Sequence, residues 1–268
     1  MPALARCIHS STRPCLTRAD RGDKLCLQTL RVVLLDVDGT LVASNESHAR
    51  AWVDALAEFG FAIPVSQMRP LIGMGGDKIL PRVHSNLDEE HEPGKSIVAR
   101  RLSIFLERYA PRLKATPGAT ALLDRFGERG LLRVAATSAN ETEFKAIVEA
   151  AGIKQHLDLW TTADDADRSK PDPDIVQSAL AKAKMAKSEA LFIGDTPYDI
   201  EAAHRTGVPI VALQCGGWSE PNLAGAEAVY ETPAHLLREY EDSIIVTGWS
   251  GKEVAPDFSL WSNRACHQ

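Results

Sequence analysis

Four short apolar runs stand out along the chain, at 31–35, 131–136, 191–193 and 208–213. Each is too short for a typical helix, and each is bounded by glycine or by a turn-forming pair such as Asp38-Gly39. These features predict buried β-strands.

Segments between these runs, such as 141–151 and 174–185, have the apolar spacing of amphipathic helices. Strands that alternate with helices predict βαβ units, and therefore an α/β fold built on a doubly wound parallel sheet. In such sheets, ligands bind at the carboxyl ends of the strands. Functional residues are therefore expected where the apolar runs end.

One region interrupts the alternation, because 46–59, 77–84 and 96–109 all have helical spacing and no strand lies between them. This pattern predicts a helical domain inserted directly after the first strand. An insertion at that point would lie over the carboxyl end of the strand, where a lid belongs. A simpler interpretation is that the inserted helices only pack against the core and have no role in the site.

The chain is thus expected to have four parts. Residues 1–28 carry scattered basic residues without periodicity, which predicts a flexible arm, although a targeting segment or a misassigned start would look similar. The α/β core is expected at 29–45 and 113–242, and the helical cap at 46–112. No role is assigned to the tail at 243–268.

Charge and composition narrow the classes of function. The net charge of −6 and pI near 5.8 argue against nucleic-acid binding, which depends on clustered Lys and Arg. No apolar run approaches the roughly 20 residues that cross a bilayer, so no membrane interaction is expected. The five cysteines show neither metal-ligand nor disulfide spacing. We therefore expect a cytoplasmic protein.

Two carboxylates, Asp36 and Asp38, follow the first predicted strand. From such a loop, Asp36 can attack an electrophilic phosphorus, while Asp38 protonates the leaving oxygen and later deprotonates water. Taken alone, Asp-x-Asp-Gly is equally consistent with an Asx-stabilised turn.

Another pair of carboxylates, Asp195 and Asp199, follows the third predicted strand. Mg²⁺ prefers hard oxygen ligands, and one or two carboxylates beside a substrate phosphate are enough to hold it. Asp199 would also suit the first turn of a helix.

Two further positions carry groups that suit phosphate chemistry. Lys170 lies between the other motifs and can offset the charges of an attacking carboxylate and a phosphate. Thr137 and Ser138 follow the second predicted strand and can donate to a phosphoryl oxygen, although Ser138 or Asn140 could equally cap the next helix.

These pieces, in this order, resemble the haloacid dehalogenase superfamily over about residues 31–230. The resemblance implies an aspartyl-phosphate on Asp36. It also implies Mg²⁺ held by Asp36, the backbone carbonyl of Asp38 and Asp195, with Asp199 assisting. The inserted helices resemble the cap of the subgroup containing phosphoglycolate phosphatase and β-phosphoglucomutase.

Within that subgroup, residues 72–78 resemble the substrate-facing loop of the cap. Gly75 and Gly76 would permit close backbone approach, and Lys78 could meet an anionic substrate group; a flexible turn is the alternative. Ser44 is a further candidate for substrate contact. His48 could also contact substrate, but an ordinary helix-surface or core histidine is the plainer interpretation, and Trp52 is interpreted as packing the cap.

The resulting expectation is a magnesium-dependent phosphatase acting on a small phosphorylated metabolite. A sugar phosphomutase would use the same core residues. A phosphonate hydrolase would need an imine-forming amine such as Lys78, and a non-catalytic binding module is disfavoured because every expected charged position is filled. Asp38 disfavours a dehalogenase. The identity of the substrate and the oligomeric state are not determined by the sequence.

Overall fold

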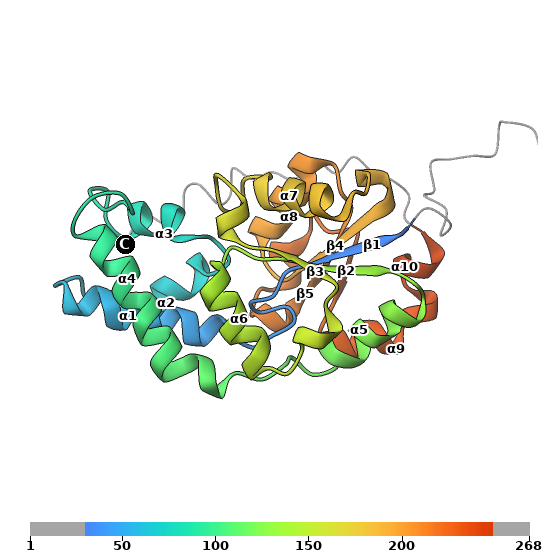
Figure 1. The fold of residues 1–268 in the computed structure, drawn as a ribbon, viewed down its shortest axis with the longest axis horizontal. Coiled ribbons are helices and arrows are strands. Elements are labelled where there is room, and N and C mark those ends of the chain that lie inside the picture. Colours follow the sequence, from blue (N-terminus) through green and yellow to red (C-terminus); the bar gives the residue numbers. More distant parts are fainter. Residues whose placement is uncertain (1–29, 249–268) are drawn as a thin grey trace, which may run out of the picture.

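A computed structural model describes residues 30–248 of the 268-residue chain (Figure 1). The predicted arm at 1–28 and most of the predicted tail lie outside this range. Six parallel strands form one sheet in the order β3-β2-β1-β4-β5-β6. They are β1 (Val32–Leu35), β2 (Leu132–Ala136), β3 (Leu159–Thr161), β4 (Ala190–Gly194), β5 (Ile210–Leu213) and β6 (Ala228–Tyr230).

Two edge strands, β3 and β6, were not predicted. Each has three residues, of which two are only partly buried, so neither leaves a distinct apolar run in the sequence. The four predicted strands are β1, β2, β4 and β5, which occupy the centre of the sheet. Apart from Leu132 and Arg133 at the start of β2, their side chains are buried on both faces, which is the usual situation in a parallel sheet covered by helices.

Alternate residues of each central strand serve two separate cores. Val33 and Leu35 of β1 join one apolar cluster, and Val32 and Leu34 join the other, because successive side chains point to opposite faces. Helices α7 (Asp174–Ala183) and α8 (Pro197–Thr206) cover one face of the sheet in Figure 1. The opposite face packs against α5 (Ala119–Glu128), α6 (Glu141–Ala150) and α9 (Pro233–Arg238).

Helices α1 to α4, which follow β1 in the chain, stand to one side of the sheet (Figure 1). We call residues 45–112 the helical insertion; it contains α1 (Asn45–Glu58), α2 (Val65–Met68), α3 (Gly76–Val83), α4 (Gly94–Ile104) and a π-helical turn at Phe105–Tyr109. The three predicted helical segments correspond to α1, α3 and α4 with the π turn. Helices α1 and α4 pack against each other. Near the end of the described range, α10 spans Ile244–Thr247.

Candidate active site

The first pair of carboxylates lies in the loop directly after β1. The backbone amide of Asp36 still bonds to Ile193 O of the neighbouring strand at 2.9 Å, so the sheet fixes this residue. Gly39 then turns the chain with φ +86°, and an added Cβ there would lie 2.3 Å from Asp195 Oδ2. Only glycine combines this conformation with so close an approach. The turn thus brings the end of β1 against the end of β4.

Three buried carboxylates meet at these strand ends. Asp36, Asp195 and Asp199 each offer one oxygen, and these atoms lie within 4.8 Å of one another. Burial, together with the charges of Asp36 and Asp199, holds the pKa of Asp195 well above its usual range. Such mutual repulsion is relieved when a cation binds between the groups.

The surroundings of Asp195 fit a bound metal ion. Gly216 follows β5, and a Cβ at this position would lie 1.6 Å from Asp195 Oδ2, so the absence of a side chain keeps space open at the oxygen. Asn45 Nδ2 donates a hydrogen bond to the same atom, Asp195 Oδ2, at 3.0 Å. A set of carboxylate oxygens suits a hard divalent cation.

Asp199 also caps the N-terminus of α8. Its Oδ2 accepts from the hydroxyl of Thr196 at 2.7 Å and from the Thr196 amide at 3.0 Å, forming a capping box. The alternative interpretation of Asp199 as a helix-capping residue is therefore confirmed. The capping holds the other oxygen, Oδ1, beside Lys170 and the acidic cluster.

Lys170 is fully buried between two of these carboxylates. Its Nζ lies 2.5 Å from Asp36 Oδ1 and 2.8 Å from Asp199 Oδ1. Burial alone would lower the pKa of the ammonium, but the charges of Asp199 and Asp36 raise it above the usual value. Burial also raises the pKa of Asp36, which Lys170 partly offsets, to about 7. The cation therefore stays charged beside Asp36.

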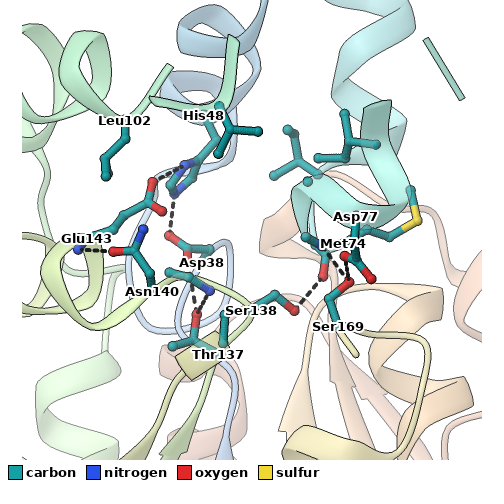
Figure 2. Close-up of a pocket in the computed structure, with 18 of the residues that line it drawn as sticks. Asp38, His48, Met74, Asp77, Leu102, Thr137, Ser138, Asn140, Glu143 and Ser169 are labelled. Atoms are coloured by element: carbon teal, nitrogen blue, oxygen red, sulfur yellow. Dashed lines mark hydrogen bonds and ion pairs between the residues drawn. The ribbon is translucent and has the colours of Figure 1, made fainter. Parts of the chain in front are cut away.

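The Asp38 side chain points toward His48 of the helical insertion (Figure 2). Its Oδ1 accepts from Ser44 Oγ at 2.5 Å and contacts His48 Nε2 at 2.7 Å, and its Oδ2 lies 3.4 Å from Thr137 Oγ1. Burial would raise the pKa of Asp38, but His48 and Ser44 outweigh this effect and lower it. Asp38 is thus held in one orientation by three side chains.

His48 connects Asp38 to a buried ion pair that sequence reasoning missed. Arg101 Nη2 of α4 lies 2.5 Å from His48 Nδ1, Glu143 Oε1 of α6 lies 3.4 Å from the same nitrogen, and Arg101 also bonds to Glu143. The imidazole stacks on Phe105, with ring centroids 4.2 Å apart. His48 is buried, as a packing residue would be, but its contact with Asp38 makes it part of the site. The spacing of Asn45 and His48 on one face of α1 was the available signal.

The predicted substrate contacts divide into two groups. Gly75, Gly76 and Ser138 line a cavity of about 370 Å³ that also reaches Asp36 and Asp38. Ser44 and Lys78 are not among its lining residues. Ser44 is fully buried against Asp38, and Lys78 Nζ instead lies 2.9 Å from Asp172 Oδ2 of the core.

The cavity lies between the sheet and the helical insertion. Thr137 and Ser138 contribute to it from the end of β2, while Trp52 and Gly76 come from the insertion. Ser138 Oγ bonds to Gly73 O at 3.3 Å, and Ser169 Oγ accepts from the Gly75 amide at 3.0 Å (Figure 2). Both bonds join the core to the insertion. Within residues 30–248, no helix has the length and apolar character needed to span a bilayer.

Comparisons with known proteins agree with this geometry. Residues 33–213 match the haloacid dehalogenase-like hydrolase family. Phosphoglycolate phosphatase of Rhodospirillum rubrum is 30% identical over 214 residues, covering 77% of this chain and 89% of that protein. The crystal structure of a hydrolase from Pseudomonas syringae is similar with a TM-score of 0.73 and 29% identity, covering 80% of this chain and 98% of that one.

A β-phosphoglucomutase from Clostridium difficile shares the fold at 17% identity, with a TM-score of 0.69 over 80% of this chain and 96% of that one. The chain belongs to the haloacid dehalogenase-like hydrolase family. Within the family, it is a hydrolase of the type represented by the phosphoglycolate phosphatases. The predicted fold class, family and phosphatase class are thereby confirmed.

Proposed function

We propose that this enzyme is a Mg²⁺-dependent phosphatase that hydrolyses a small phosphorylated metabolite through an aspartyl-phosphate on Asp36. The observation that carries this proposal is the meeting of Asp36, Lys170 and Asp195 in one buried cluster, although they are far apart in sequence. The similarity to phosphoglycolate phosphatases supports it. A cytoplasmic location remains a prediction.

In the first step, a carboxylate oxygen of Asp36 attacks phosphorus and the bond from phosphorus to the leaving oxygen breaks. Asp38 gives its proton to that oxygen, so the product leaves as an alcohol. Lys170 offsets the repulsion between the Asp36 carboxylate and the phosphate. The hydroxyl of Thr137 and the backbone beside Ser138 serve as donors to a phosphoryl oxygen.

In the second step, water attacks the phosphorus of the aspartyl-phosphate while Asp38 takes its proton. The bond between phosphorus and the Asp36 oxygen then breaks, which releases inorganic phosphate and restores both aspartates. Asp38 can serve both steps because Ser44, His48 and Thr137 hold it in place.

Asp36, Asp195 and the backbone carbonyl of Asp38 would hold Mg²⁺, with Asp199 beside them. The ion would supply positive charge that neutralises the phosphate oxygens. We assign residues 29–45 and 113–242 to the catalytic core and residues 46–112 to a cap that covers the cavity. A closed cap excludes bulk water from the reacting phosphate.

The test is phosphate release from p-nitrophenyl phosphate and a panel of small monoesters, with Mg²⁺ and with chelator. Asp36→Asn should lower kcat about a thousandfold or more and abolish trapping of phosphoenzyme. Asp242→Asn, at an exposed position, is the matched control. Unchanged phosphoenzyme formation in Asp36→Asn would rule out this nucleophile. Formation of an isomeric sugar phosphate in place of free phosphate would identify a phosphomutase.

A further inference from the structure

Asn45, the first residue of α1, is buried beside the carboxylates at the ends of β1 and β4. Its Nδ2 donates to Asp195 Oδ2 at 3.0 Å and to Gly216 O at 3.3 Å. An amide nitrogen carries two hydrogens, so this one atom serves a carboxylate and a backbone carbonyl at once. A hydroxyl has a single hydrogen and could not form both bonds.

The orientation of the Asn45 amide is fixed by its neighbours. Turning the amide over would place Oδ1 against Asp195 Oδ2 and Gly216 O, which are both acceptors. Gly39 leaves room for the amide, because a Cβ at that position would lie 2.1 Å from Asn45 Nδ2. The two hydrogens of the amide therefore point at the edge of the sheet where the carboxylates meet.

Asp195 is held at both of its oxygens. Thr40 Oγ1 donates to Oδ1 at 2.8 Å, and Asn45 Nδ2 donates to Oδ2. A ligand carboxylate that is held in this way does not have to reorient when a cation binds. Donors to metal ligands commonly change the affinity for the ion by about tenfold to a hundredfold.

The donor to Asp195 Oδ2 belongs to the helical insertion rather than to the core. The insertion reaches the same loop a second time, because Arg69 Nη2 donates to Gly216 O. Close by, Tyr198 of α8 donates its hydroxyl hydrogen to Pro70 O of the insertion at 2.7 Å. The position of the insertion on the core thus determines whether Asp195 keeps this donor.

Building on the Mg²⁺-dependent function proposed above, we propose that Asn45 is a positioning residue of the metal centre, which makes cation binding and docking of the insertion mutually dependent. When the insertion is docked, Asp195 is already fixed before the cation binds. Binding of the cation in turn favours the fixed carboxylate, and therefore the docked insertion, by the same factor. Metal loading and covering of the cavity are thereby linked.

Calorimetric titration of Mg²⁺ into the metal-free enzyme, without substrate, tests the effect of Asn45 on the metal. Asn45→Ala should weaken Mg²⁺ binding about tenfold. Asn45→Leu restores most of the side-chain volume without a donor, so it should weaken binding as much; a merely structural role would instead be rescued by the refilled volume. Asn86→Ala, at an exposed position of the insertion, should bind Mg²⁺ as the wild type does.

Hydrogen exchange of the backbone amides at 69–76, with and without Mg²⁺, tests the effect of the metal on docking. Mg²⁺ should slow exchange about tenfold in the wild type, because the coupling is reciprocal. At saturating Mg²⁺, exchange in Asn45→Leu should stay at its metal-free rate. Circular dichroism checks the fold of each variant.

Equal Mg²⁺ affinities of the wild type and a folded Asn45→Leu variant would overturn the inference, as would exchange at 69–76 that Mg²⁺ leaves unchanged in the wild type. Failure of the proposed metal-dependent function would look different. The wild type itself would then bind no Mg²⁺ and would not hydrolyse p-nitrophenyl phosphate, which would overturn both proposals together.

Discussion

His48 Nε2 lies 2.7 Å from Asp38 Oδ1, so the first helix of the insertion directly contacts the proposed acid/base of the core. The other ring nitrogen, Nδ1, lies 2.5 Å from Arg101 Nη2 and 3.4 Å from Glu143 Oε1, so both nitrogens of His48 face charged groups. The position of the insertion and the orientation of Asp38 are therefore linked through a single imidazole.

His48→Gln tests this link. We expect kcat for p-nitrophenyl phosphate to fall about tenfold to a hundredfold, because Asp38 loses an orienting partner during proton transfer. KM should change less, and the pH–rate profile should shift. Steady-state kinetics at a series of pH values measures kcat, KM and the pH–rate profile. His84→Gln, at an exposed position of the insertion, should behave as wild type; an unaltered profile in His48→Gln would refute the orienting role.

Glu143 gives a prediction about stability and pH. Burial would raise its pKa, but Arg101 and His48 outweigh burial and lower it. A carboxyl group whose folded pKa is lowered stabilises the protein above its unfolded pKa, near 4.5, and this stabilisation is lost as pH falls through the folded pKa.

Glu143→Gln should therefore reduce the free energy of unfolding by about 2 kcal/mol near pH 7, where it leaves Arg101 without a charged partner. Urea denaturation should show the difference from wild type shrinking as the pH is lowered below about 4.5. Glu141→Gln, exposed on the same helix, should have little effect at either pH. If the loss in free energy of unfolding were the same at every pH, the ion pair between Glu143 and Arg101 would not be its cause.

Gly216→Ala tests the metal site without removing a ligand. The new Cβ would lie 1.6 Å from Asp195 Oδ2 and must displace that carboxylate. We expect the Mg²⁺ concentration for half-maximal activity to rise about tenfold or more. In Gly127→Ala, the nearest atom is the movable end of Arg133, so the Mg²⁺ requirement should stay unchanged. Equal metal titrations for both variants would place Mg²⁺ away from Asp195.

Lys78 distinguishes a substrate contact from an ion pair between insertion and core. Because Lys78 Nζ pairs with Asp172, Lys78→Ala should change KM less than about twofold and lower stability by less than about 1 kcal/mol. Ser138→Ala, which alters the cavity lining, should raise KM more. Steady-state kinetics and thermal unfolding measure both effects. A large rise in KM for Lys78→Ala alone would restore its predicted contact with substrate.

The central strands and the loops that follow them could be read from the sequence. Apolar runs predicted β1, β2, β4 and β5, and Asp36, Thr137 and Asp195 follow three of them. The strands could be predicted because a strand buried on both faces is a continuous run of apolar residues. The site could be predicted because the carboxyl ends of parallel strands lie at the same edge of the sheet. The edge strands β3 and β6 have weaker signals because they are short and half-buried.

The partners of individual side chains were decided by tertiary structure alone. From the sequence, Ser44 and Lys78 are predicted to contact the substrate. In the structure, Ser44 bonds to Asp38 and Lys78 pairs with Asp172. Arg101 and Glu143 lie 42 residues apart and showed no pattern that would pair them. Sequence spacing reports neighbours within one helix or strand, whereas a charge responds to whatever group the packing of distant elements brings beside it.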